Sequence, residues 1–195
     1  MDVIVTAAVG TNADLLPNVF ALYVPDGSVV ADVTYGRGVF WKQIDESKYE
    51  VLKSDLVMNG IDFRQLPYES DSVDCLILDP PYMHGGKTIK KSINKCYRNE
   101  NGSHESVIRL YAGGILEAAR VLRKGGRVII KCQDEIESGK QQLSHIEISH
   151  LLEILGFRTL DMFVLVQNTI PAMRENYQKS ARKNHSYIIV AEFRR

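Results

Sequence analysis

The most chemically specific run in the sequence is Asp79-Pro80-Pro81-Tyr82, which directly follows the apolar stretch 73–78. Two successive prolines remove two backbone donors and restrict φ, and the residue before a proline is biased towards an extended conformation. The run therefore predicts a stiff corner that offers a carboxylate, carbonyl oxygens and an aromatic ring, but few hydrogen-bond donors. Such a corner suits a substrate that presents N–H groups.

The exocyclic amino group of a nucleic-acid base is a substrate of this kind. Its lone pair is delocalised into the ring, so the nitrogen is a poor nucleophile. Acceptors at Asp79 and at the Pro80 carbonyl would hold both N–H bonds and free the lone pair, and Tyr82 would stack on the base. The alternative is a rigid turn that ends a strand, with Tyr82 packed on the surface.

A second group is the glycine pair Gly36 and Gly38, which follows an expected strand at 28–33. Glycine permits positive φ and lets a ligand approach the backbone closely. A dinucleotide-binding loop would carry a third glycine where this sequence has Trp41, which argues against a nicotinamide dehydrogenase. A purely structural turn between a strand and a helix remains the alternative.

Two carboxylates follow the glycine pair at suitable distances. Asp55 comes after the expected strand 49–52, where a carboxylate can accept two hydrogen bonds from a ribose diol. Asp62 lies in a weaker expected strand at 61–63 and could accept a bond from an adenine amino group. Each residue could equally be a solvated loop carboxylate.

Apolar runs alternate with longer mixed segments, which indicates an α/β fold. Helices are expected at 107–122, ended by the glycines at 125 and 126, and at 146–155, and residues 39–42 open another. Parallel sheets bind ligands at the carboxyl ends of their strands, so both unusual loops are expected at one edge. The expected strands cover residues 28–33, 49–52, 61–63, 73–78, 127–131, 159–166 and 187–191.

The composition is that of one soluble domain covering residues 1–195, with a formal net charge of zero. Zero net charge argues against a protein that coats nucleic acid non-specifically. The three cysteines are far apart and lack zinc-ligand spacing, so we expect reduced thiols, no metal and a cytoplasmic location. No apolar stretch approaches the roughly 18 residues of a membrane span.

The order of these motifs resembles that of the amino-methylating class I S-adenosylmethionine-dependent methyltransferases, which include the DNA adenine-N6 and cytosine-N4 methyltransferases. The sequence departs from their usual glycine motif at Thr34, where an aromatic residue is common, and at Tyr35 and Arg37, which replace small residues. The resemblance rests on Asp32, Thr34, Gly36, Gly38, Phe40, Asp55, Asp62, Leu66, Pro67, Ser72, Asp74, the run 79–82, and the segments 116–126, 155–157 and 182–187.

The resemblance implies a three-layer Rossmann-like fold, with a mostly parallel seven-stranded sheet whose last strand is antiparallel. S-adenosylmethionine would lie over Gly36 and Gly38, with Asp55 at its ribose. Asp62 and the backbone of Phe63 would hold the adenine. The remaining cofactor-binding expectations are Asp32 near the methionine amino group, Asn12 at the methionine end, and Thr34 and Phe40 within the glycine motif.

The sequence leaves no room for a separate target-recognition domain, so residues 83–105 are the candidate substrate-binding loop. Residues 83–99 contain no acidic side chain, and their cations would neutralise phosphates. Solvated basic loops are the alternative. The candidate nucleic-acid-binding residues are Lys87, Lys90, Lys91, Lys95 and Arg98, with Arg182 and Lys183 in a second basic segment.

The resulting functional expectation is direct, in-line methylation of adenine N6 in DNA. Cytosine N4 in DNA and an amino group in RNA, either adenine N6 or guanine N2, stay open, as does a non-catalytic binding module on the same fold. The expected partner is DNA or else RNA, with no membrane. The chain would act as a monomer or a homodimer, and a separate recognition subunit is a further option.

Overall fold

The computed structural model describes residues 3–81, 103–168 and 180–195. Its centre is a seven-stranded sheet in the order β1-β8-β9-β5-β4-β2-β3, in which β9 runs antiparallel to both neighbours and the other pairs are parallel. This confirms the expected sheet. Its strands are β1 (Ala7–Val9), β2 (Val29–Asp32), β3 (Glu50–Lys53), β4 (Val73–Leu78), β5 (Leu122–Cys132), β8 (Phe157–Val166) and β9 (His185–Phe193).

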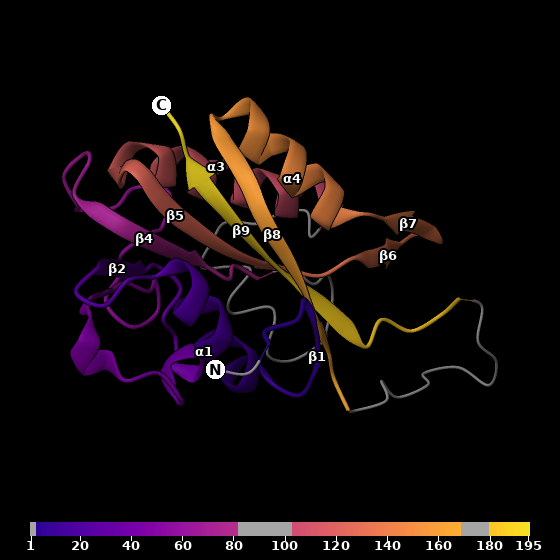
Figure 1. The fold of residues 1–195 in the computed structure, drawn as a ribbon. Coiled ribbons are helices and arrows are strands. Elements are labelled where there is room, and N and C mark those ends of the chain that lie inside the picture. Colours follow the sequence, from indigo (N-terminus) through magenta and orange to yellow (C-terminus); the bar gives the residue numbers. More distant parts are fainter. Residues whose placement is uncertain (1–2, 82–102, 169–179) are drawn as a thin grey trace.

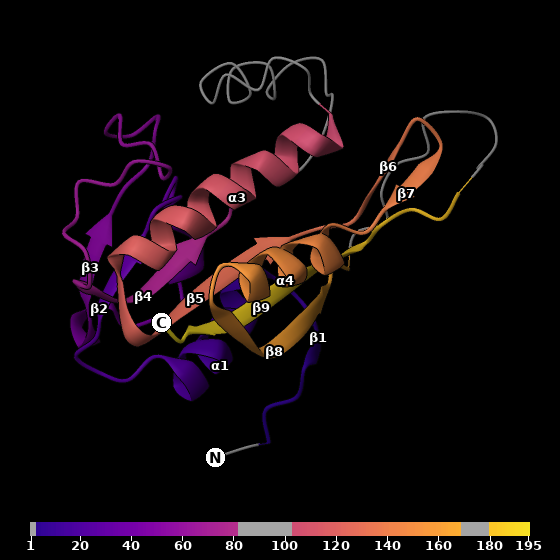
Figure 2. The ribbon, with the colours of Figure 1, turned by 90° about the horizontal axis from the view of Figure 1, so that it is seen from above.

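Helices cover both faces of the sheet and make three layers (Figure 1). The helix α1 (Asn12–Tyr23) lies on one face, and α3 (His104–Val121) and α4 (Ser144–Ile154) lie on the other (Figure 2). Each interface buries its own apolar cluster. No helix in the described part of the chain combines the length and apolar character needed to cross a membrane.

The structure corrects several expected elements. Residues 61–63 form no strand, because Asp62 accepts the backbone N–H of Arg64 in a tight turn; the seventh strand is the short β1 instead. Residues 39–41 form only one 3₁₀ turn. Residues 104 and 105 of the candidate loop begin α3.

Two further differences surround β5. The helix α3 ends at Val121, so the glycines at 125 and 126 do not terminate it; they lie within β5, where the pairing with β4 shifts register. After β5, the strands β6 (Glu135–Glu137) and β7 (Lys140–Gln142) form a separate two-stranded sheet that projects from the main one (Figure 2).

The register of β2 against β4 brings the two unusual loops together. Asp32 pairs with Ile77 in this parallel ladder, so counting two residues further along each strand sets Thr34 beside Asp79. The Asp79 backbone N–H accordingly donates to the Thr34 hydroxyl over 2.8 Å. The glycine loop and the proline corner are therefore joined directly.

The neighbouring ladders extend this alignment across four strands. Leu78 pairs with Ile130, so Asp79 and Lys131 follow side by side, while on the other side Asp55 falls level with Thr34. We call Asp55, Thr34, Asp79 and Lys131 the carboxyl-edge row. It places four polar side chains at the carboxyl ends of four parallel strands: Lys131 is the penultimate residue of β5, and the other three follow their strands by one or two residues.

The Thr34–Asp79 hydrogen bond predicts a stability effect. Thr34→Val keeps the shape of the side chain but leaves the partly buried Asp79 N–H without its acceptor, so we expect the free energy of unfolding to fall by about 1–3 kcal/mol. Urea denaturation followed by circular dichroism measures this change.

Thr159→Val is the matched control, because the buried Thr159 hydroxyl has no hydrogen-bond partner among the described residues. Its removal should leave the unfolding free energy unchanged or raise it. Equal losses in the two variants would show that the Thr34 hydroxyl does not support the corner.

Candidate functional site

A pocket of about 220 Å³ opens at the carboxyl ends of β2 and β4, beside the first turn of α1. Its lining comes from three segments far apart in the sequence, and it brings together six of the predicted site residues. These are Asn12, Asp32, Thr34, Gly36, Phe40 and Asp79, with Tyr35, Arg37 and Val39 completing the lining.

The glycine turn needs both of its glycines, for different reasons. Gly36 and Gly38 have φ values of +53° and +64°, in the left-handed region that other residues rarely adopt. A Cβ on Gly38 would lie 2.8 Å from the Tyr35 hydroxyl, whereas a Cβ on Gly36 would meet nothing closer than 3.8 Å. Gly38 therefore allows the turn to close, and Gly36 leaves open space over the backbone.

The Asp32 carboxylate is buried and organises the turn from below. It accepts the Trp41 indole N–H over 2.8 Å and the Thr34 backbone N–H over 3.1 Å. Burial raises the pKa of Asp32 to about 7, although both hydrogen bonds act to lower it. In the sequence, Trp41 argues against a dinucleotide-binding loop. In the structure its indole N–H is a hydrogen-bond donor to Asp32, which gives Trp41 a structural role.

The two oxygens of the Asp79 carboxylate have different surroundings. Its Oδ2 lies 3.5 Å from the Lys131 ammonium, and its Oδ1 is inaccessible and receives no hydrogen bond from any described residue. Burial raises the pKa of Asp79, and the nearby Lys131 charge opposes that rise. An acceptor left in this state favours a ligand that brings its own N–H group.

Lys131 is a further candidate residue at this edge, and the sequence analysis did not identify it. It ends the apolar run 128–130 on β5, its side chain is only 6% exposed, and its ammonium lies 5.8 Å from the centre of the Phe40 ring. A lone lysine within a buried strand is unusual. A lysine in an apolar strand, at the sheet edge where ligands are expected, is the sequence feature that could have identified Lys131.

Asp55 lies beside the glycine turn. Its Oδ1 accepts the backbone N–H groups of Val57 and Met58, and its Oδ2 would be 4.0 Å from a Cβ placed on Gly36. The turn after β3 therefore fixes the carboxylate next to the most open part of the glycine loop. This is the position predicted for a ribose ligand.

Asp62 and Phe63 do not line the pocket. Asp62 forms an ion pair with Arg64 at 2.6 Å; burial acts to raise the pKa of Asp62, but the hydrogen bonds from Arg64 outweigh it and the pKa is lowered. Phe63 is 1% exposed and packs in the core beneath α3. An adenine amino group would have to compete with Arg64 for Asp62.

The remaining predicted residues fall into three groups. Arg182 is exposed and Lys183 half-buried, just before β9, which starts at the carboxyl edge because it is antiparallel to β5. In the corner itself, Pro80 is buried and Pro81 half-buried. Tyr82, Lys87, Lys90, Lys91, Lys95 and Arg98 lie outside the described residues.

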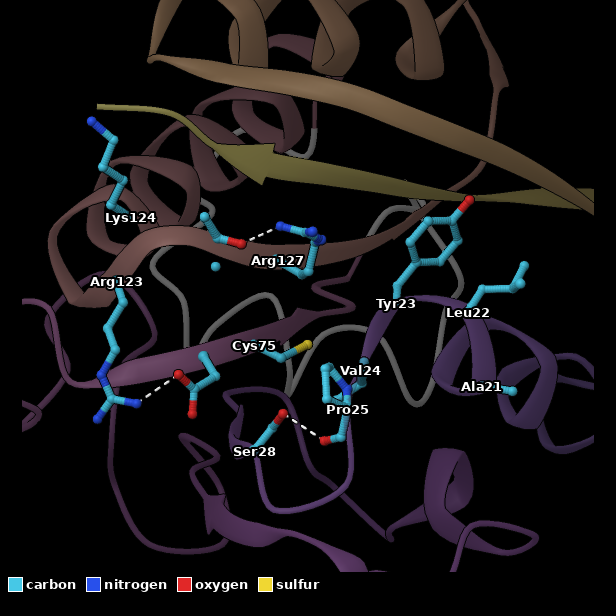
Figure 3. Close-up of a pocket in the computed structure, with 13 residues that line it drawn as sticks. Ala21, Leu22, Tyr23, Val24, Pro25, Ser28, Cys75, Arg123, Lys124 and Arg127 are labelled. Carbon is cyan, nitrogen blue, oxygen red and sulfur yellow. Dashed lines mark hydrogen bonds and ion pairs between the residues drawn. The ribbon is translucent and has the colours of Figure 1, made fainter.

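A second pocket, of about 400 Å³, lies at the amino ends of β2 and β4 (Figure 3). Arg123 and Arg127 approach it, but Arg123 is held by Asp74 at 2.6 Å and Arg127 by the carbonyl of Gly125. Ligands of parallel sheets bind at the opposite, carboxyl edge. We therefore take the smaller pocket as the candidate site.

No family model and no curated protein matches this chain. Among solved structures, a "Putative DNA Modification Methylase" from Thermus thermophilus, complexed with S-adenosyl-L-methionine, is 20% identical over 68% of this chain and 53% of its own, with a TM-score of 0.48. The present chain thus spans about half the length of that protein.

Two other structures resemble a larger part of the chain. TrmN from Thermus thermophilus is 19% identical and covers 92% of this chain and 48% of its own, with a TM-score of 0.57. An S-adenosylmethionine-dependent methyltransferase from Methanosarcina mazei is 12% identical and covers 90% of this chain and 97% of its own, with a TM-score of 0.57. The chain therefore has the fold of the S-adenosylmethionine-dependent methyltransferases.

Proposed function

We propose that this protein is an S-adenosylmethionine-dependent methyltransferase that acts on an exocyclic amino group of a nucleic-acid base, with adenine N6 in DNA as the first candidate. One observation carries the proposal. The carboxylate of the proline corner lines the same pocket as the glycine turn, and the Asp79–Thr34 hydrogen bond links the two.

The residues around the glycine turn fit the cofactor. The open backbone at Gly36 would accept a close approach, Asp55 would hold the ribose hydroxyls, and Asn12 would lie at the methionine end. Asp62 and the backbone of Phe63 are the proposed adenine contacts. When bound, S-adenosylmethionine would supply the methyl group and leave as S-adenosylhomocysteine, and the methylated amino nitrogen would release its proton to water.

The proline corner fits the substrate amine. Asp79 Oδ1 lacks a donor from the described residues, and Pro80 contributes a carbonyl oxygen and no backbone N–H. Two N–H groups held by these acceptors would leave the nitrogen lone pair directed at the methyl group. No covalent enzyme intermediate is required.

The nucleic acid would approach over the same edge. Arg182 and Lys183 precede β9 there, and the proposed substrate segment 83–105 follows the proline corner in the sequence, with its last two residues in α3. Phosphate contacts in this region would position the strand beside the pocket. Residues 1–195 would act as one methyltransferase domain in this arrangement.

The acceptor is tested by incubating the purified chain with isotope-labelled S-adenosylmethionine and either DNA or RNA, followed by mass spectrometry of the nucleosides. We expect label in N6-methyladenine from DNA. Label in N4-methylcytosine, or in an RNA base, would replace adenine as the acceptor. Cofactor binding without label in any base would refute the enzyme and favour a binding module.

Asp79→Ala tests the proposed mechanism. Loss of the carboxylate removes an acceptor for the amine but no part of the glycine turn, so kcat should fall by about 100-fold or more while the Kd for S-adenosylmethionine stays largely unchanged. Asp26→Ala, at an exposed carboxylate on the opposite edge, is the control and should keep full activity. Near-normal turnover by Asp79→Ala would contradict the mechanism.

Gly36→Val tests cofactor binding at the glycine turn. A branched side chain at φ +53° would fill the open space over the backbone, and we expect calorimetry to detect no binding of S-adenosylmethionine. Gly27→Val is the matched control, since Gly27 also has positive φ and open surroundings but precedes β2 at the far edge. Unchanged binding in the Gly36 variant would place the cofactor elsewhere.

A further inference from the structure

We propose that Lys131 is a positioning residue of the methyl-transfer site, whose ammonium holds one oxygen of the Asp79 carboxylate and keeps the group ionised as an acceptor for the substrate amine. The proposal rests on the function proposed above. It begins from the 3.5 Å ion pair between the Lys131 ammonium and Asp79 Oδ2.

The backbone of Lys131 is fixed on three sides. Lys131 follows Ile130, which pairs with β4 in the parallel ladder, and it pairs with Ile188 in the antiparallel ladder with β9. From α3, the fully buried Tyr111 donates its hydroxyl to the Lys131 carbonyl over 2.7 Å. The side chain therefore leaves β5 from a well-defined point beside Asp79.

The burial of the Lys131 side chain indicates that its charge interacts with a specific partner. Lysine is seldom buried unless it is paired, because desolvation penalises the ammonium. Here the side chain is 6% exposed, and the Asp79 carboxylate and the Phe40 ring contribute to offsetting that penalty. A lysine with only a packing role would be replaced by an apolar residue at lower cost.

The two oxygens of Asp79 then have different roles. Oδ2 is held by Lys131, whereas Oδ1 is buried and has no hydrogen bond from the described residues. The ionised carboxylate is the stronger acceptor for an amino N–H, because neither oxygen carries a proton and the hydrogen bond is charge-assisted. Burial raises the pKa of Asp79, and Lys131 acts against that rise.

The other charged groups around Asp79 include two further carboxylates. Asp32 on β2 interacts unfavourably with Asp79, and Asp55 after β3 adds a further carboxylate to the same edge. Arg37 contributes a cation from the glycine turn, and Cys132, next to Lys131, is a buried thiol. Among the described residues, the ammonium paired with the Asp79 carboxylate is that of Lys131.

The pH dependence of turnover tests this role. In Lys131→Met the side chain keeps its length but loses its charge, so the pKa of Asp79 rises and ionisation requires a higher pH. The acidic limb of the kcat profile should therefore move to higher pH by about one pH unit or more, whereas Lys131→Arg should stay close to the wild-type profile.

Two further measurements separate this role from a merely structural one. Lys124→Met, at an exposed lysine on the far end of β5, should leave the profile unchanged. A ¹³C NMR titration of labelled aspartate, with Asp79→Asn to assign the signal, should show Asp79 titrating at higher pH in Lys131→Met without any turnover. If Lys131→Met folds poorly, the double variant with Asp79→Asn should regain the lost stability, because it leaves no unpaired charge.

The outcomes separate the two proposals. An active wild-type enzyme whose kcat profile and Asp79 titration are the same in Lys131→Met would overturn the role of Lys131 and leave the proposed function intact. So would a double variant no more stable than Lys131→Met. A wild-type enzyme that transfers no methyl group to DNA or RNA would refute the proposed function, and the role of Lys131 in that reaction with it.

Discussion

The parallel register of β2, β4 and β5 is the constraint on which the candidate site depends. Because Asp32 pairs with Ile77 and Leu78 with Ile130, the polar residues at the carboxyl ends of these strands are brought level by the sheet itself. The carboxyl-edge row is thus fixed by the same backbone hydrogen bonds that build the core. Chemistry placed on such a rigid edge varies little in geometry, as a direct methyl transfer requires.

The burial of two carboxylates is the second feature that characterises the site. Burial raises the pKa of both Asp32 and Asp79. At Asp32 the N–H donors of Trp41 and Thr34 oppose this rise, and at Asp79 the charge of Lys131 opposes it. Neutral donors bind both oxygens of Asp32, which also lines the candidate pocket. At Asp79 the Lys131 ammonium lies beside Oδ2, and Oδ1 has no hydrogen bond from the described residues.

Much of the fold and part of the site could be predicted from the sequence. The apolar strand before Asp79 and the glycines after β2 are local patterns that predict strand ends, and the sheet then brings them together. The strand predicted at residues 61–63 is wrong, because the Asp62 side chain accepts a hydrogen bond from the Arg64 backbone where the chain turns. β1, at three residues, is too short to give an alternating pattern.

Lys131 shows the limit of local patterns. A lysine after an apolar run is normally the solvated end of a strand, and only the register with β4 reveals that it faces a carboxylate. Trp41 is similar, since its indole N–H finds Asp32 through a turn whose shape depends on Gly38. In both cases the informative fact is a pairing between distant residues, which a single sequence does not show.

The most direct test of this account is a crystal structure of the protein with S-adenosylhomocysteine, the demethylated form of the proposed cofactor. We predict that the ligand lies over Gly36 and Gly38 with its ribose at Asp55 and its sulfur on the side facing Asp79. A ligand bound at the amino ends of the strands, or with its sulfur turned away from the proline corner, would contradict the claim that this edge joins a methyl donor to a base.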